Sequence, residues 1–338
     1  MKQKIGYFLL GLLYAFIFYV NGIIGIIETT ISLILYCILF FFIYSLWEKF
    51  RKREPLNFVE FGKKFIYKIC LFIYTIAFII WGFAFYNNSI NPATMPQFTI
   101  SNGQKTVVFQ AMSHIARPDF YKQVEQEIRD FKTSSGVLFY EGVKEGTKES
   151  NDKFDQALGV NFTPDLYKNM SRLYGVTFQD NSKLLGLVNN LDFNVDLTLD
   201  EVVKIYEEKV KNNGTKNVNN QEVINASDEI IAQLSTLNDR ELKILVYINQ
   251  AILNLIIKND KEMKKLLENF GNPDLLDVIL DERNKNLADN IEKSEYNKIF
   301  ITYGLLHFEG VLKLLQESDS KWKIISTKEL YPISEKKF

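Results

Sequence analysis

The chain has 338 residues, of which 24% are charged, and its formal net charge at pH 7 is −1. Residues 1–86 hold nine Lys and Arg against four Asp and Glu, so residues 87–338 carry a net charge of −6. This net negative charge argues against a nucleic-acid partner, which would need a basic face. It contains no cysteine, which excludes disulfides and thiolate metal ligands.

The N-terminal part is built from three apolar runs, and we expect transmembrane helices over about 5–27, 28–47 and 65–86. A hydrocarbon core about 30 Å thick needs roughly 20 apolar residues, which each run reaches or nearly reaches. In an alternative arrangement, the first two runs form one re-entrant unit. The lipid bilayer is therefore the first expected partner, with residues 1–86 as a membrane anchor.

Basic residues indicate the orientation of these runs. They precede the first run and fill the loop at 48–64, whereas residues 21–28 contain no Lys or Arg. The positive-inside rule then predicts a multi-pass protein of the cell membrane, with its N-terminus and the 48–64 loop in the cytoplasm. Residues 87–338 are expected on the extracytoplasmic side.

The rest of the chain is predicted to form a polar connector over 87–104 and one α/β domain over 105–338. A strand at 106–111, a helix at 117–132 and a strand at 137–141 make a βαβ unit. A mainly helical middle part follows, with helices expected over 164–174, 198–210, 221–236, 239–258, 260–269 and 274–292. A strand at 298–304, a helix at 310–317 and a strand at 322–327 close the chain. We therefore expect a parallel-type central sheet covered by helices, with a helical insertion.

The only two histidines and one glutamate follow predicted strands closely. His114 comes after the first strand, Glu141 ends the second, and His307 follows the strand at 298–304. Ligands of open parallel sheets bind beyond the carboxyl ends of the strands. Imidazole and carboxylate suit manganese, cobalt or zinc. The pattern predicts a site for one of these divalent ions, although each residue by itself is equally compatible with an ordinary loop.

These residues resemble the motifs of the TraB/TIKI/GumN superfamily, whose members are membrane-associated or secreted and carry two Gly-x-x-His motifs. The second motif is present as GLLH, from Gly304 to His307. The first reads AMSH, so Ala111 stands where the family has glycine, before His114. Glycine there would permit close backbone approach or a positive φ. The family's glutamate at the end of the next strand is matched by Glu141.

Two further pieces extend the resemblance over roughly 105–327. Glu282, Arg283 and Asn284 match a Glu-Arg-Asn run that precedes the second motif, and Asp196 lies in a less specific middle region. The resemblance implies an α/β domain with pseudo-repeated halves. In the TIKI branch it also implies a divalent-metal protease that acts outside the cell, whereas other branches regulate peptide signalling.

Together these features lead us to expect a membrane-anchored, divalent-metal-dependent peptidase or hydrolase that acts on an extracytoplasmic peptide or protein. His114 and His307 would bind the cation, with Glu141 as third ligand or general base. Arg283 would stabilise the developing oxyanion or a substrate carboxylate. Accessory roles are expected for Ala111, Gly304, Asp196 and Asn284. The alternative, favoured by the alanine in the first motif, is a non-catalytic membrane protein that binds or sequesters a secreted signalling peptide.

Overall fold

The computed structural model describes residues 2–142, 146–158, 164–179, 186–213, 226–259 and 273–338. Contacts between residues divide the chain into two compact units. One unit comprises Met1–Ala84 and Leu237–Ile248, and the other comprises Phe85–Thr236 and Asn249–Phe338. This division differs from the expected one, because residues 237–248 pack with the N-terminal helices rather than with the α/β domain.

The N-terminal unit contains two long apolar helices, α1 (Lys2–Phe50) and α2 (Phe58–Phe85), where three separate helices were expected. Both are long and apolar enough to cross a membrane. The first two apolar runs merge in α1, which is kinked at Gly22. The backbone there has φ 67° and ψ −155°, a conformation that glycine adopts readily because it lacks a Cβ. The break therefore lies at Gly22, and Glu28 is inside the second arm of α1.

Contacts on both sides of the kink hold this unit together. The Tyr14 hydroxyl lies 3.0 Å from Thr30 Oγ1, which joins the two arms of α1. The Tyr74 hydroxyl of α2 donates to the Leu9 carbonyl of the first arm at 3.1 Å. Phe61 of α2 packs its ring against rings of the second arm. The arms and α2 are thus packed against one another.

The second unit is organised around a six-stranded sheet in the order β6-β4-β7-β2-β1-β8. Its strands are β1 (Met95–Ser101), β2 (Thr106–Met112), β4 (Val137–Tyr140), β6 (Phe193–Asn194), β7 (Lys298–Gly304) and β8 (Lys323–Leu330). The four strands from β6 to β2 are parallel, whereas β1 is antiparallel to both of its neighbours. The predicted mixed α/β architecture is confirmed, with a sheet that is only mostly parallel.

Strand β1 was not expected, because it lies within the predicted connector. Its second residue is Pro96, and proline lacks the N–H that a strand interior normally donates. The strand nevertheless pairs with β2 on one side and β8 on the other. Consequently β8 lies at the edge of the sheet, separated from β7 by β2 and β1, and does not form a second adjacent βαβ unit.

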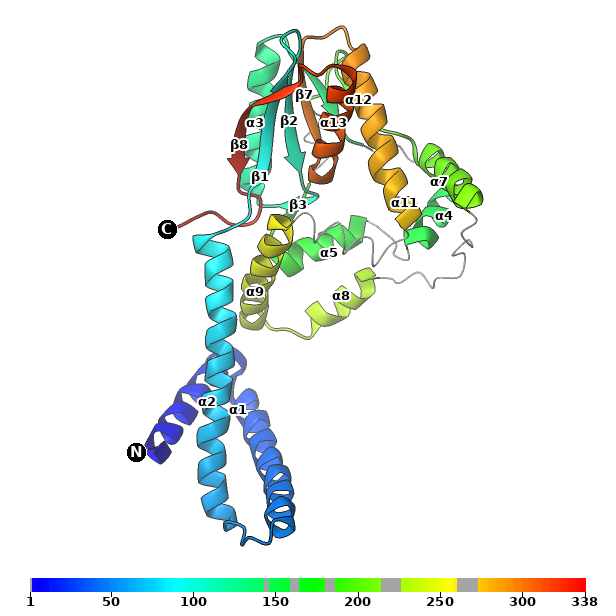
Figure 1. Cartoon of the computed structure of the whole chain (residues 1–338). Coiled ribbons are helices and arrows are strands. Elements are labelled where there is room, and N and C mark those ends of the chain that lie inside the picture. The colour runs from blue at the N-terminus through cyan, green and yellow to red at the C-terminus, as the bar shows by residue number, and fades with distance from the viewer. Residues whose placement is uncertain (1, 143–145, 159–163, 180–185, 214–225, 260–272) are drawn as a thin grey trace. The chain divides into compact units, whose positions relative to one another are not determined.

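Helices cover both faces of the sheet. Helix α3 (Pro118–Thr133) packs on one face, where Phe300 of β7 joins its core cluster. Helices α12 (Arg283–Lys293) and α13 (Phe308–Ser318) pack on the other face, together with Ile299 and Ile301. This alternation along β7 is the period of two that places successive side chains on opposite faces. Figure 1 shows the two helical layers on either side of the strands.

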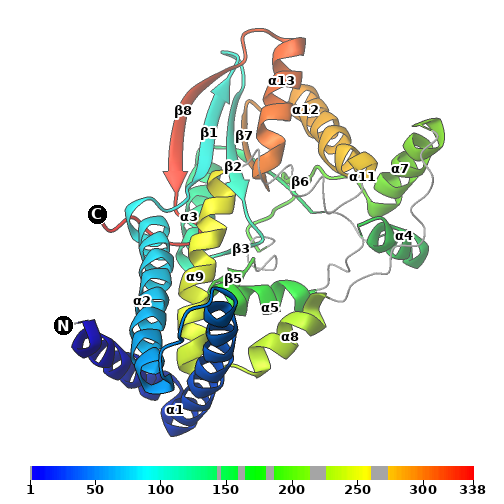
Figure 2. The same cartoon turned by 60° about the horizontal axis from the view of Figure 1, so that its bottom comes forward.

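The helical insertion between β4 and β7 is also confirmed (Figure 2). The predicted helix at 260–269 lies outside the described residues. The helices of the insertion are α4 (Lys148–Leu158), α5 (Pro164–Tyr174), α7 (Leu199–Asn213), α8 (Ala226–Ser235), α9 (Asp239–Lys258) and α11 (Pro273–Asp277).

Smaller elements complete the second unit. A one-turn π-helix, η1 (Tyr86–Ile90), precedes β1, and a second, η2 (Val278–Glu282), leads into α12. A small sheet pairs β3 (Ile115–Ala116) with β5 (Thr177–Phe178).

Strand register brings the predicted site residues to one edge. Met112 of β2 pairs with Gly304 of β7, and Tyr140 of β4 pairs with Thr302. The carboxyl ends of these three parallel strands therefore lie at one edge of the sheet, with β4 ending two residue positions before β2 and β7. The turns that follow them carry the two Gly-x-x-His-like motifs and Glu141.

Candidate active site

A buried arginine joins two carboxylates at this edge. Arg283, the first residue of α12, donates from Nε to Asp196 Oδ1 and from Nη2 to Asp196 Oδ2, both at 2.7 Å. Its Nη2 also donates to Glu141 Oε1 at 2.6 Å. Burial by itself would lower the pKa of Arg283, but the charges of Glu141 and Asp196 raise it above its ordinary value. The guanidinium therefore stays charged and pairs with both carboxylates.

Asp196 is the most enclosed member of this group, with a side chain that is 0% exposed. It accepts hydrogen bonds from the Tyr303 hydroxyl at 2.9 Å and from the Gly142 N–H at 3.2 Å, in addition to those from Arg283. Burial raises the pKa of Tyr303 above its ordinary value, so the phenol remains a donor. A buried carboxylate needs such partners, because an unpaired charge away from water is costly.

Glu141 follows β4 directly and is held from two sides. Its Oε1 accepts from Arg283, and its Oε2 accepts from the Gly304 N–H at 2.8 Å. Its own N–H donates to the Thr302 carbonyl at 3.0 Å, which continues the pairing with β7. The side chain is 20% exposed, so this carboxylate is fixed in position and still reachable from solvent.

His307 is buried in η3 (Leu305–His307) and is held in one orientation. Its Nδ1 lies 2.8 Å from Asn284 Oδ1, and its ring meets Tyr303 edge-on at 4.8 Å between centroids. An amide oxygen only accepts, so Nδ1 carries the proton and Nε2 keeps its lone pair. Burial, helped by the charge of Arg283, lowers the pKa of His307 to about 3. The imidazole is therefore neutral at physiological pH.

The glycine of the second motif separates Glu141 from His307. A Cβ on Gly304 would lie 3.7 Å from Glu141 Oε2, 3.4 Å from His307 Cδ2 and 4.0 Å from His307 Nε2. Gly304 has φ −56° and ψ 143°, which any residue adopts, so the motif does not need glycine for backbone conformation. Its role here is to leave room beside both functional groups.

The first motif is arranged differently. Ala111 is fully buried, belongs to the core cluster that includes residues of α3, and pairs with Tyr303 in the register of β2 with β7. Its methyl group therefore packs in the core one residue before Met112, the residue that pairs with Gly304. His114 is exposed in the turn between β2 and β3, where its carbonyl accepts from the Gln179 N–H at 2.8 Å.

The donor set matches a divalent cation in part. Nε2 of His307 has no hydrogen-bond partner among the described residues, and the Glu141 carboxylate borders the same space. Both are good ligands for manganese, cobalt or zinc. Across the described ranges, however, no three His, Cys, Asp or Glu side chains lie close enough together to hold one metal ion. The structure thus groups His307 with Glu141 but does not add His114 to them.

From the sequence, no role in this network was assigned to Tyr303 or Gly310. Tyr303 links Asp196 to His307. It directly precedes Gly304, and this position next to the second motif could have indicated that it belongs to the site. Gly310 lies against Asn284, since a Cβ there would come within 2.2 Å of Asn284 Nδ2. Nothing in the sequence pattern alone indicated that contact. Asp196 and Asn284, expected as accessory residues, both belong to the network.

Comparison with known proteins gives one finding on this site. Residues 214–323 match the sequence model described as the TraB/PrgY/gumN family. This range contains Arg283, Asn284, Gly304 and His307, whereas Glu141 and the first motif precede it. No curated protein and no solved structure matches the chain.

Proposed function

We propose that this chain, whose residues 214–323 belong to the TraB/PrgY/gumN family, is a membrane-anchored hydrolase that uses a divalent cation to cleave peptides. The observation that carries the proposal is the space beside Gly304, which both His307 and Glu141 border. The peptide substrate follows from the resemblance to the TIKI branch.

His307 and Glu141 would hold the cation, with His114 as a candidate third ligand from the same edge of the sheet. When bound, the cation supplies Lewis acidity and lowers the pKa of a coordinated water. Asn284 fixes the tautomer of His307 so that Nε2 presents its lone pair. Glu141 is held by Arg283 and the Gly304 N–H, which aim its carboxylate at the same space.

Arg283 acts in this scheme as a positioning residue. The Nε and Nη2 groups of its guanidinium are taken by Asp196 and Glu141, so they are not free to stabilise an oxyanion. Its charge also keeps His307 neutral, since a nearby cation disfavours protonation of the imidazole. A neutral imidazole is the form that binds a metal ion.

The anchor part of the proposal has the chain cross the membrane three times, with both arms of α1 and with α2. Helix α1 is kinked at Gly22. Segment 237–248 packs next to this kink, where Asn238 Nδ2 donates to the Val20 carbonyl at 3.2 Å. In this proposal the later segment and the basic loop around Arg53 lie on opposite sides of the membrane. In cells, a membrane-impermeant maleimide should label Gln104→Cys without permeabilisation and Arg53→Cys only after it, in a Cys37→Ser/Cys70→Ser background. The reverse pattern would refute this orientation.

Two observations favour the alternative, a non-catalytic protein that binds a secreted peptide. Arg283 already pairs with both Glu141 and Asp196, and His114 does not complete a three-ligand group within the described residues. Such an edge can recognise a polar peptide without cleaving it.

The test compares metal content and peptide hydrolysis in the detergent-solubilised full chain. After loading with manganese, cobalt or zinc and dialysis, the wild type should retain about one ion per chain. His307→Ala and Glu141→Gln should lose both the ion and the hydrolysis. Glu309→Ala is the matched control, because it removes an exposed carboxylate two residues after His307 and should change neither.

Opposite results separate the two functions. A wild type that binds a peptide but retains no ion and cleaves nothing would support the binding protein. Ion retention that is equal in the wild type and in both site variants would show that the cation binds elsewhere.

A further inference from the structure

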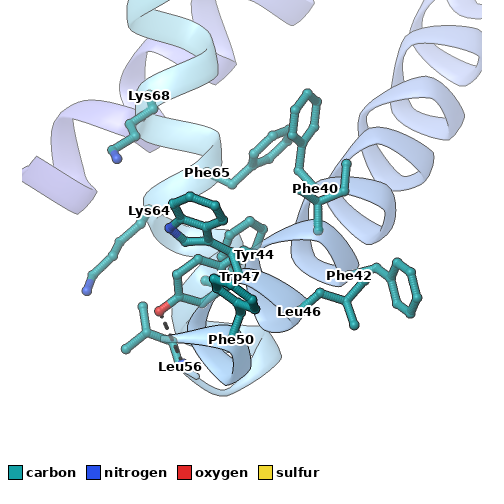
Figure 3. A pocket seen from close by; sticks show the side chains of 12 residues that line it. Phe40, Phe42, Tyr44, Leu46, Trp47, Phe50, Leu56, Lys64, Phe65 and Lys68 are labelled. Atoms are coloured by element: carbon teal, nitrogen blue, oxygen red, sulfur yellow. Dashed lines mark hydrogen bonds between the residues drawn. The ribbon is translucent and has the colours of Figure 1, made fainter. Parts of the chain in front are cut away.

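A hollow of about 1220 Å³ lies between the second arm of α1 and the first turns of α2, next to the loop that joins them (Figure 3). Ten of its twelve lining side chains are apolar or aromatic, and the other two are Lys64 and Lys68. Trp47 and Phe50 are among these lining residues, and both are exposed, Phe50 to 83%. So much exposed aromatic surface needs an apolar partner.

The two lysines give this hollow a charged rim. Lys64 and Lys68 are four residues apart, and Figure 3 shows both extending from the same side of α2. Both are exposed, and neither has an ion-pair partner among the described residues. Arg51 adds a third cation, since its guanidinium lies 4.9 Å from the centroid of the Trp47 ring.

The charge distribution narrows the choice of partner. Residues 48–68 hold seven Lys and Arg against three Asp and Glu, so the rim attracts anions. A second copy of the chain, placed across a two-fold axis, would bring like charges together. A phospholipid instead presents an apolar chain and an anionic group side by side, and basic residues at a membrane surface attract anionic lipid.

We propose that this hollow binds one anionic phospholipid. Its acyl chain lies against the aromatic wall that includes Phe40 and Phe65, and its phosphate lies at Lys64 and Lys68. Trp47 packs at the level of the headgroup, where aromatic residues of membrane proteins concentrate. The inference rests on the membrane-anchoring part of the proposed function and does not depend on catalysis.

Native mass spectrometry of the full chain released from detergent tests this proposal. The chain is titrated with phosphatidylglycerol and phosphatidylcholine of identical acyl composition. The wild type should retain one phosphatidylglycerol molecule with an affinity about tenfold higher than for phosphatidylcholine. Lys64→Gln/Lys68→Gln should lose this preference, and Phe65→Ala should bind both lipids more weakly. Unchanged helical circular dichroism and elution volume show that the variants are folded.

The matched control is Lys52→Gln/Arg53→Gln, which removes two charges from the same basic loop without changing the lining of the hollow. It should keep the preference. Equal retention of both lipids by the wild type, or an equal loss in the two double variants, would overturn the site. A chain that carbonate extraction leaves in the soluble fraction would refute the membrane anchor as well, whereas a membrane-bound chain without lipid preference refutes this proposal alone.

Discussion

The burial of His307 makes the stability of the folded chain depend on pH. Burial lowers the folded-state pKa of His307 from 6.5 to about 3. In the unfolded chain the His307 imidazole is therefore protonated below pH 6.5, whereas in the folded chain it is protonated only below about pH 3. The stability associated with the neutral imidazole is complete above pH 6.5 and is lost as the pH falls through this window. When the pH falls from 7 to 5, this group should lower the free energy of unfolding by about 2 kcal/mol.

Denaturant unfolding of the wild type and His307→Gln at both pH values measures this loss. The variant lacks the titrating imidazole, so its stability should fall by about 2 kcal/mol less than that of the wild type. His114→Gln keeps His307 in place and should follow the wild type. If His307→Gln lost as much stability as the wild type, the imidazole would not be held neutral by burial.

Much of this site could be predicted from the sequence at the level of single residues. Glu141 and His307 follow strands that the β-branched and aromatic pattern identifies, and parallel strands end at one edge. The position of His114 relative to them could not be predicted, because it depends on the conformation of the turn after β2. The fixed pairing of Arg283 with Asp196 also depends on tertiary packing, as 87 residues separate them in the chain.

Among the elements, α1 differs most from the sequence prediction. Hydropathy separated its two apolar runs at Glu28, the charged residue, whereas the helix breaks at Gly22, the residue that tolerates a positive φ. Strand β1 was missed for a related reason, since Pro96 argues locally against a strand that its neighbours stabilise. In α1 the backbone conformation at Gly22 decided the position of the break, and in β1 pairing with both neighbours decided the strand. Composition alone predicted neither.

Alanine at position 22 should straighten α1. The observed φ and ψ would cost an alanine about 1–3 kcal/mol, and a continuous helix relieves that strain. A straight helix would place Tyr14 and Thr30 about 24 Å apart, whereas their side chains now meet. A short bismaleimide should therefore cross-link Tyr14→Cys to Thr30→Cys efficiently with Gly22 and poorly with Gly22→Ala, in a chain whose native cysteines are both changed to serine.

Gly11→Ala is the control for this experiment, because a Cβ at Gly11 meets nothing within 4 Å and its backbone does not have a positive φ. Cross-linking in Gly11→Ala should equal the level seen in the chain that retains both Gly11 and Gly22. Equal cross-linking in Gly22→Ala would show that the break in α1 does not depend on glycine.

At the scale of the whole molecule, the α/β class and the apolar N-terminal segment follow from composition and periodicity. The division of helix α9 between the two compact units does not. Its first half belongs to the N-terminal unit, where Tyr247 packs on Trp81 with 5.1 Å between ring centroids. Its second half belongs to the α/β unit, where the fully buried Asn254 accepts from the Ala93 N–H at 2.9 Å. Hydropathy cannot show such a division, since the helix is continuous and amphipathic.

Deletion of residues 1–86 should therefore loosen only the first half of α9. Residues 239–248 lose Trp81 and the carbonyl partners near Gly22, while residues 249–258 keep theirs. Hydrogen exchange should show protection in 239–248 falling by about tenfold or more in the truncated chain, because local opening becomes cheap where packing is lost. Residues 249–258 of the same helix serve as the internal control and should keep their protection. Unchanged protection along the whole of α9 would mean that the α/β unit alone orders this helix, and that segment 237–248 does not depend on the membrane-type helices.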